Sequence, residues 1–415
     1  MEQTKLWNKN FTILTIGQII SLFGNGILRF ALPLHILLIT GSAELMGRIL
    51  ALSLIPMALI APFGGVLADR VNKKRIIVFL DFLTAGVTFF YLWTIGFLSI
   101  VPITIVALIL LSPIKSMMSA ATDASVPLIV PAGELARANS VTMTINSLSM
   151  LLGPMLGGVF LAGLGLEITL VICGVCFVLA AVMELFIRIP SVTQGTSGNM
   201  VADVMGDLRD GFRFAIRTKP IISKILLTII AFNFLAPSIA IIGIPVIIVQ
   251  NLGMDERMIG LSQGFMGAGG IVGGVLAGVL VQKLRIQQGH WFMCITALLI
   301  VPIGLVILFS VNVNAAFWII NASMFVALAV ITMFSIQVMT FIQKISPAEL
   351  LGKMMALIML ATLVSQPLGN WLVGILFDMF YPYVWKVIFP VAGLTALVAI
   401  CSRMYFKNIS VEQEA

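Results

Sequence analysis

Long apolar runs separated by short polar links cover most of this chain. Each run is about as long as the 20 residues that a helix needs to cross the hydrocarbon core of a bilayer. The runs predict helices near residues 11–39, 45–68, 76–97, 101–122, 139–164, 167–188, 221–250, 258–281, 289–310, 315–342, 352–377 and 384–405. The expected fold is therefore an all-α integral membrane protein, with twelve transmembrane helices in two pseudo-symmetric six-helix bundles.

The composition excludes a soluble globular domain, because 60% of the residues are hydrophobic, 10% are charged and the mean hydropathy is +1.13. The net charge of +7 could suggest a nucleic-acid partner. However, the basic residues lie at helix ends and form no separate domain, so we expect a lipid bilayer as partner and no nucleic acid. The first run starts near Phe11 and lacks a small-residue cleavage site, which predicts that it stays as the first helix.

The basic residues orient the predicted helices. If both termini are cytoplasmic, nineteen of the 24 Lys and Arg residues lie on the inner side. Only Arg48, Arg257 and Lys386 then lie outside, while Arg29 and Lys115 remain within helices. This asymmetry follows the positive-inside rule and predicts a multi-pass protein of the cell membrane with both ends in the cytoplasm.

The second half of the chain repeats landmarks of the first. The paired segments are Gly41-Ser-Ala-Glu and Gly253-Met-Asp-Glu, Pro131-Ala-Gly-Glu and Pro347-Ala-Glu-Leu, and Gly153-Pro154 and Gln366-Pro367. The repeat predicts an N-terminal six-helix bundle over residues 1–189 and a C-terminal one over residues 220–415. Between them, residues 190–219 read as a linker whose apolar residues from Val201 to Ile216 recur at helical spacing, which predicts an amphipathic helix on the inner membrane face.

The link between the second and third helices resembles the signature Gly-x3-Asp-Arg-x-Gly-(Arg/Lys)-(Arg/Lys) of major facilitator superfamily transporters. The matching residues are Gly65, Asp69, Arg70, Lys73 and Lys74. Asn72 stands where Gly is usual, and Asn tolerates left-handed backbone better than most other residues. A positive-inside anchor would explain the basic residues, but it would not explain the acid or the glycine.

The resemblance implies that this loop is a gate. In the family, the acid pairs with the loop arginine and lies against the start of helix 11, where a helix N-terminus favours a carboxylate by roughly 0.3–1 kcal/mol. Asp123, at the inner end of the fourth helix, is a candidate third member that reaches Arg70, or else a solvated surface acid. In the second half Gln282 stands where Asp69 does in the first, so any electrostatic latch is asymmetric.

The fifth helix carries Ser149-x3-Gly153-Pro154-x2-Gly157-Gly158, which resembles the antiporter signature Gly-x3-Gly-Pro-x2-Gly-Gly. Gly153 and Gly157 are one turn apart and leave a smooth strip that another helix can approach closely. Pro154 removes a backbone hydrogen bond and can kink the helix. The resemblance implies antiport, whereas ordinary small-residue packing is the alternative.

Arg29 and Lys115 are ionisable residues within predicted membrane helices. Each would cost about 2.5–3.5 kcal/mol if it faced lipid, so both should face the bundle interior. A structural pairing, for example with Asp81, is the alternative to a substrate role. In the resembled fold, helices 1, 4, 7 and 10 line the central cavity, which gives as candidate substrate contacts Asn25, Arg29, Lys115, Asn233, Asn321 and Gln337.

Proton coupling has two candidates, Asp81 and Lys115. The arginine that drug-efflux members carry in the middle of helix 4 is absent here, and Lys115 lies one turn beyond its place. No acid is expected deep in the cavity, and Glu184 and Arg188, one turn apart, look like a local pair.

Three further segments resemble the macrolide-efflux-type branch of drug:proton antiporters: Gly-Gln18-x-x-Ser21-Leu22, Leu135-Ala-Arg137-Ala-Asn139 and Asp207-Leu-Arg209-x-Gly211-Phe212-Arg213. The resemblance implies proton-driven export of amphiphilic, antibiotic-like small molecules by alternating access. Export of an endogenous natural product, siderophore or lysolipid is an alternative, and a non-transporting membrane sensor is another. We expect a monomer without cofactor, metal or enzymatic activity, because two histidines are too few for an imidazole site and Cys173-x-x-Cys176 lies in an apolar run.

Overall fold

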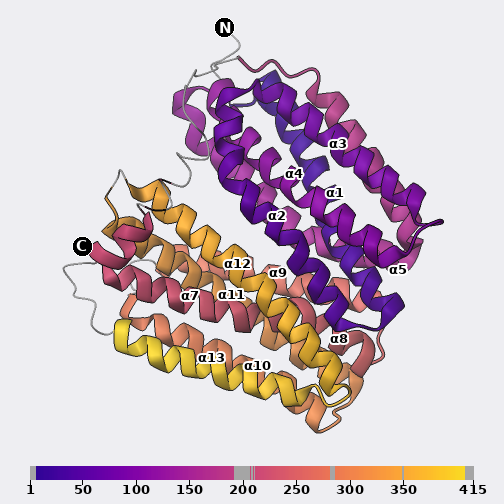
Figure 1. Cartoon of the computed structure of the whole chain (residues 1–415), viewed down its shortest axis with the longest axis vertical. Coiled ribbons are helices and arrows are strands. Elements are labelled where there is room, and N and C mark those ends of the chain that lie inside the picture. The colour runs from indigo at the N-terminus through magenta and orange to yellow at the C-terminus, as the bar shows by residue number, and fades with distance from the viewer. Residues whose placement is uncertain are drawn as a thin grey trace. The chain divides into compact units, whose positions relative to one another are not determined.

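The computed structural model describes residues 6–190, 206, 209, 211–280, 286–347 and 350–406. Across these ranges the chain forms helices joined by short links, with no strand (Figure 1). The helices of the first half are α1 (Lys9–Thr40), α2 (Ala43–Arg70), α3 (Lys73–Thr94), α4 (Ile100–Ile129), η2 (Ala132–Glu134) and α5 (Leu135–Glu184). Those of the second half are η3 (Phe214–Thr218), α7 (Pro220–Ser238), η4 (Ile239–Gly243), α8 (Ile244–Val246), η5 (Ile247–Asn251), α9 (Glu256–Leu280), η6 (Ile286–Gln288), α10 (Gly289–Leu308), α11 (Val313–Ile345), α12 (Leu351–Phe380) and α13 (Trp385–Phe406).

The described helices confirm the twelve predicted membrane spans. Among the described residues, ten stretches are long and apolar enough to cross a bilayer, and one of them, Arg137–Glu184 within α5, has 48 residues. At 1.5 Å per residue it is about 72 Å long, more than twice the hydrocarbon thickness. It is interrupted at Gly165, whose φ of 76° and ψ of 174° are not helical, so α5 supplies two spans. The 28-residue α2 adds the twelfth.

The helices group into two compact units. One unit comprises Met1–Ile39 and Leu52–Val204, and the other comprises Thr40–Ala51 and Met205–Ala415. We call them the N-terminal bundle and the C-terminal bundle. The C-terminal bundle includes the first turns of α2, so this helix begins in one unit and ends in the other.

The landmarks that repeat in the sequence also share backbone geometry. Gly41, before α2, and Gly253, before α9, adopt left-handed φ values of 65° and 63°. The turns after α4 and α11 match as well: the Glu134 N–H donates to the Pro131 carbonyl at 2.9 Å, and the Leu350 N–H donates to the Pro347 carbonyl at 2.9 Å. The two halves therefore use the same local turns at corresponding places.

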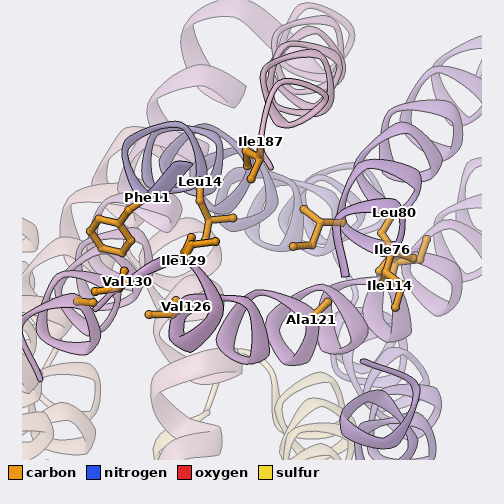
Figure 2. Close-up of a cluster of buried hydrophobic side chains, with 12 residues drawn as sticks. Phe11, Leu14, Ile76, Leu80, Ile114, Ala121, Val126, Ile129, Val130 and Ile187 are labelled. Carbon is orange, nitrogen blue, oxygen red and sulfur yellow. The ribbon is translucent and has the colours of Figure 1, made fainter. Parts of the chain in front are cut away.

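A buried apolar cluster lies within the N-terminal bundle. In Figure 2, Phe11 and Leu14 of α1 lie near Ile129 at the end of α4, while Leu80 of α3 lies near Ile114 of α4. In a bilayer, lipid tails are as apolar as these side chains, so the cluster stabilises the bundle by close van der Waals packing rather than by removal from water. The cluster holds α1, α3 and α4 together, and Ile114 also lines the polar cavity described below.

The signature loop follows the prediction only in part. Asn72 does not adopt a left-handed conformation, since its φ is −61° and its ψ is 111°; it is the N-cap of α3, and its side chain accepts a hydrogen bond from the Arg75 N–H at 3.3 Å. The explanation of Asn72 by left-handed backbone is therefore wrong. Gly65, Asp69 and Arg70 lie within α2, but their side chains are outside the described part of the structure, and the predicted gate remains a prediction.

Candidate functional site

A polar cavity lies inside the N-terminal bundle between α1, α3, α4 and α5. Its volume of about 60 Å³ is enough for water molecules, which need roughly 10–15 Å³ each by this measure. Its polar lining includes Gln18, Ser21, Asn25, Asp81, Lys115, Asp123 and Glu184. The cavity thus brings together Asn25, Lys115, Asp81 and Asp123, for which the sequence predicts three different roles.

Asp81, from the middle of α3, has no exposed surface. The hydroxyl of Ser21 on α1 donates to its Oδ1 at 2.8 Å. The structure does not show the structural pairing of Asp81 with Arg29 or Lys115, because neither base forms an ion pair with any described residue. Asp81 is held by a hydroxyl rather than by a cation.

Glu184, at the end of α5, is the functional candidate that the sequence reasoning missed. Its side chain is buried, with 2% exposure, and its carboxyl group lies within hydrogen-bonding reach of that of Asp81. The predicted local pair with Arg188 is wrong, since Glu184 makes no ion pair within the part of the chain described. The prediction that no acid lies deep in the central cavity stays a prediction, but the cavity inside this bundle receives one acid from the third span and one from the sixth.

The α1 sequence explains how two acids fit at this place. A Cβ atom on Gly17 would lie 2.9 Å from Oε1 of Glu184, so a larger residue there would displace that carboxyl group from its present position. Ser21, one turn later on the same face, supplies the donor to Asp81. The sequence holds no signal that links Gly17 or Ser21 to Glu184, which lies about 160 positions further along the chain.

The other N-terminal candidates have few polar partners. Asn25 is buried and donates from Nδ2 to the Ser21 carbonyl of its own helix at 3.0 Å. Nη1 of Arg29 contacts the Met57 sulfur at 4.0 Å. Asp123 is exposed, accepts a long 3.5 Å hydrogen bond from Ser119, and its predicted contact with Arg70 involves a side chain outside the described part.

The glycine strip of the fifth span packs against α1. A Cβ on Gly153 would lie 2.8 Å from the Cα of Gly26, and one on Gly157 would lie 3.2 Å from the Ile27 carbonyl oxygen. Ser149, which replaces the first glycine of the signature, donates to the Leu22 carbonyl at 2.8 Å. The helix interior also contains Pro154, and Gly158 is buried. The strip is therefore a close helix–helix contact with one added hydrogen bond.

The candidates in the C-terminal bundle are buried or partly buried amides. Asn233 and Asn321 each donate to the carbonyl one turn earlier on their own helix, at 3.0 Å and 2.8 Å. Asn321 Oδ1 and both amide atoms of Gln337 are buried and have no hydrogen-bond partner among the described residues. These groups can bind a polar ligand without carrying charge.

An apolar groove of about 720 Å³ lies in the C-terminal bundle between η3, α7 and α12. Its walls include Phe212, Leu227, Phe234 and Leu360, and its polar lining residues are Ser223, Lys224 and Ser365. Its size and composition are those of a site for a small apolar ligand, since such sites typically measure about 300–1,000 Å³.

Asp378, near the end of α12, caps the start of α2. Its Oδ2 accepts from the Ser42 hydroxyl at 2.6 Å and from the Glu44 N–H at 2.9 Å, and its Oδ1 accepts from the Ala43 N–H at 2.7 Å. A carboxylate is favoured at a helix N-terminus because it satisfies free N–H groups and complements the helix dipole. The sequence reasoning did not single out this residue.

Comparisons with known proteins give a consistent result. The family model described as Major Facilitator Superfamily matches residues 14–369. The chain is 22% identical to macrolide efflux protein A of Streptococcus pyogenes over 373 residues, which are 89% of each chain. It is 26% identical to the enterobactin exporter EntS of Salmonella typhimurium over 382 residues, 90% of this chain and 86% of the relative.

Solved structures show the same fold at low sequence identity. The nucleoside transporter NupG matches with a TM-score of 0.73 at 12% identity, over 96% of this chain and 99% of the other. A bacterial homologue of the iron transporter ferroportin in an inward-facing state matches with a TM-score of 0.72 at 17% identity, over 95% and 98%.

Proposed function

The chain belongs to the Major Facilitator Superfamily, and from this premise we propose that it exports amphiphilic small molecules by alternating access, coupled to proton entry. Multi-pass insertion and a small-molecule substrate follow from the family. Location in the cell membrane, cytoplasmic termini and action as a monomer are parts of the proposal, the first two supported by the distribution of basic residues. The macrolide efflux protein and the enterobactin exporter, each covering about nine-tenths of the chain, support the outward direction.

The observation that carries the proposal is the polar cavity inside the N-terminal bundle. Ionisable side chains are costly within a membrane and mark ion or substrate pathways there. Asp81, Lys115 and Glu184 line one cavity and belong to spans of high hydropathy. Helices in such spans can pack through apolar side chains alone, so packing does not explain the three ionisable groups. The arrangement supports a transporter over a membrane sensor because it provides exchangeable protons within the bundle.

The substrate class follows from both bundles. In the C-terminal bundle, the apolar groove suits a hydrophobic body, and the amides of Asn233 and Gln337 suit polar substituents. In the N-terminal bundle, the cations Arg29 and Lys115 form no ion pair with a described residue, so they disfavour simple lipophilic cations. We therefore infer a preference for neutral, zwitterionic or anionic amphiphiles.

Export of an endogenous natural product is the second candidate. It is favoured by the similarity to the enterobactin exporter of Salmonella typhimurium. Export of antibiotic-like molecules and export of a natural product would use the same binding groups. They differ in whether the substrate comes from outside or is made by the cell that contains the transporter. Biosynthetic genes beside the coding gene would favour the second.

Inverted membrane vesicles that contain the protein provide the test. We expect a proton gradient, acidic inside, to drive uptake of enterobactin or of a neutral amphiphile, with proton release that follows substrate addition. Ethidium should be taken up weakly by the wild type and better by Arg29→Ala, because the replacement removes a repelling charge. Equal ethidium uptake by both proteins, or no dependence of any uptake on the gradient, would contradict the proposal.

A further inference from the structure

We propose that Asp81 and Glu184 form one carboxyl pair that carries the coupled proton, and that Ser21 positions it. The inference deepens the proposed function and rests on it, because a coupled proton requires a residue that holds it. Neither the family match nor the relatives assign a role to Glu184, and its position late in the sixth span gives no hint of one.

The geometry of the pair is unusual for two acids. Asp81 and Glu184 are 0% and 2% exposed, come from α3 and α5, and lie within hydrogen-bonding reach of each other. Oδ2 of Asp81 and Oε2 of Glu184 have no hydrogen-bond partner among the described residues. Within the same described part of the chain, the one side-chain hydroxyl that donates to the pair is that of Ser21.

Chemistry then determines the charge of the pair. Two carboxylates can share a hydrogen bond only if one of them is protonated, and two buried carboxylates in contact repel each other strongly when both are ionised. One proton is therefore held between Asp81 and Glu184 in the arrangement described. The aspartic-protease dyad follows the same rule.

The groups around the pair allow this proton to be released. Lys115 and Asp123 of α4 line the same cavity, whereas α1 contributes no charged side chain to its described lining. When the pair gives up its proton, the carboxyl O–H bond breaks, the electron pair stays on the oxygen and the proton passes to water in the cavity. The ammonium group of Lys115 then offsets the added negative charge, and the reverse step reloads the pair.

Lys115 links this step to transport. It lies near Arg29, whose positive charge repels it. A substrate or a conformational change that alters the position of either base changes how well the ionised pair is stabilised. The protonation of the pair is thus coupled to the positions of Arg29 on α1 and Lys115 on α4. These two helices line the central pathway in the family.

The test begins with the protonation of the pair itself. Infrared spectra of the purified protein in lipid nanodiscs, recorded against pH in heavy water, should show a carboxylic-acid carbonyl band that disappears on alkalinisation. Glu184→Gln keeps the shape of the side chain but cannot ionise, and Asp81→Asn does the same at the partner position. Each replacement should remove or shift this band. Glu167→Gln, at an exposed position of the same helix, should leave the band unchanged.

Transport supplies the second readout, with enterobactin as the probe. Both variants should lose accumulation driven by a proton gradient yet retain exchange of labelled for unlabelled probe across proteoliposomes without a gradient. Retained exchange shows that a variant is folded. Ser21→Ala should keep coupled transport but shift its pH profile, which a merely structural role would not do.

The outcomes separate the inference from the proposed function. If the wild type accumulates probe under a proton gradient and both variants do so equally well, the pair is not the carrier, while proton-coupled export stands. An unchanged carbonyl band in both variants would overturn the inference in the same way. If the wild type shows exchange but no response to the gradient, proton coupling fails, and the carrier role fails with it.

Discussion

The two bundles share a packing frame but differ in their buried chemistry. In the N-terminal bundle, Gly153 of the fifth span lies against the backbone of α1, and in the C-terminal bundle, Gly369 of α12 lies against the Phe234 carbonyl of α7. The buried charged residues among those described, Lys73, Asp81 and Glu184, all belong to the N-terminal bundle. The described buried polar groups of the C-terminal bundle are hydroxyls and amides, such as Gln337.

The two bundles share their close helix contacts but not their buried ionisable groups, and the physical reasons for the two features differ. Close helix contacts need a small residue at a fixed place, so they are retained in both copies. An ionisable group costs free energy within the membrane and is kept only where it acts. We therefore expect proton handling in the N-terminal bundle, while the neutral amides and the apolar groove of the C-terminal bundle contact the substrate.

The largest expected effect concerns the inner end of the second span in each half. Asp69→Asn should reduce gradient-driven uptake by roughly 5- to 150-fold, the range of a conformational coupling worth about 1–3 kcal/mol. The physical reason is loss of the carboxylate that the predicted latch requires. Gln282→Ala, at the corresponding place in the second half, should change uptake little because that side chain carries no charge.

Uptake into inverted vesicles at matched expression measures both effects, and a size-exclusion profile in detergent confirms that each protein is folded. Similar losses from the two variants would show that the latch is symmetric. The difference in buried charge between the two bundles would then have no counterpart in the loops that carry Asp69 and Gln282.

The sequence predicts the fold nearly completely and the site only in part. The lengths of the spans, the break near Gly165 and the repeated turns depend on residues that are close together in the sequence, so a single sequence is enough to predict them. The pairing of Asp81 with Glu184 joins residues about 100 positions apart, and only the packing of α3 against α5 brings them together. Helical spacing favours a local partner, which is why the sequence pairs Glu184 with Arg188 instead. The role of Asp378 could not be predicted from the sequence for the same reason, because its partners at the start of α2 are distant along the chain.

A smaller effect is expected at Gln337. Its two amide atoms are buried and lack hydrogen-bond partners among the described residues, which costs about 1–3 kcal/mol for an unsatisfied buried group. Gln337→Leu should therefore raise thermal stability while it lowers the rate of substrate uptake, because the amide no longer meets the substrate. Differential scanning fluorimetry and uptake at several substrate concentrations measure the two effects. A loss of stability would instead assign Gln337 a structural role.

The smallest effect is expected at Asp378, a half-buried acid of the C-terminal bundle. It is a helix cap with three hydrogen bonds to the start of α2, so its charge is already compensated. Asp378→Asn keeps one acceptor oxygen but loses the other, so it should lower the free energy of unfolding by about 0.5–1.5 kcal/mol, the contribution of one typical hydrogen bond. The number of protons moved per substrate should stay unchanged.

Glu44→Gln is the matched control for this cap. Glu44 forms an exposed ion pair with Arg48 at 3.7 Å, and such pairs contribute at most about 1 kcal/mol. Thermal unfolding in nanodiscs should therefore separate the two variants, with the larger shift at Asp378. If Asp378→Asn instead altered proton stoichiometry, an acid of the C-terminal bundle would take part in coupling, and the assignment of proton handling to the N-terminal bundle alone would be wrong.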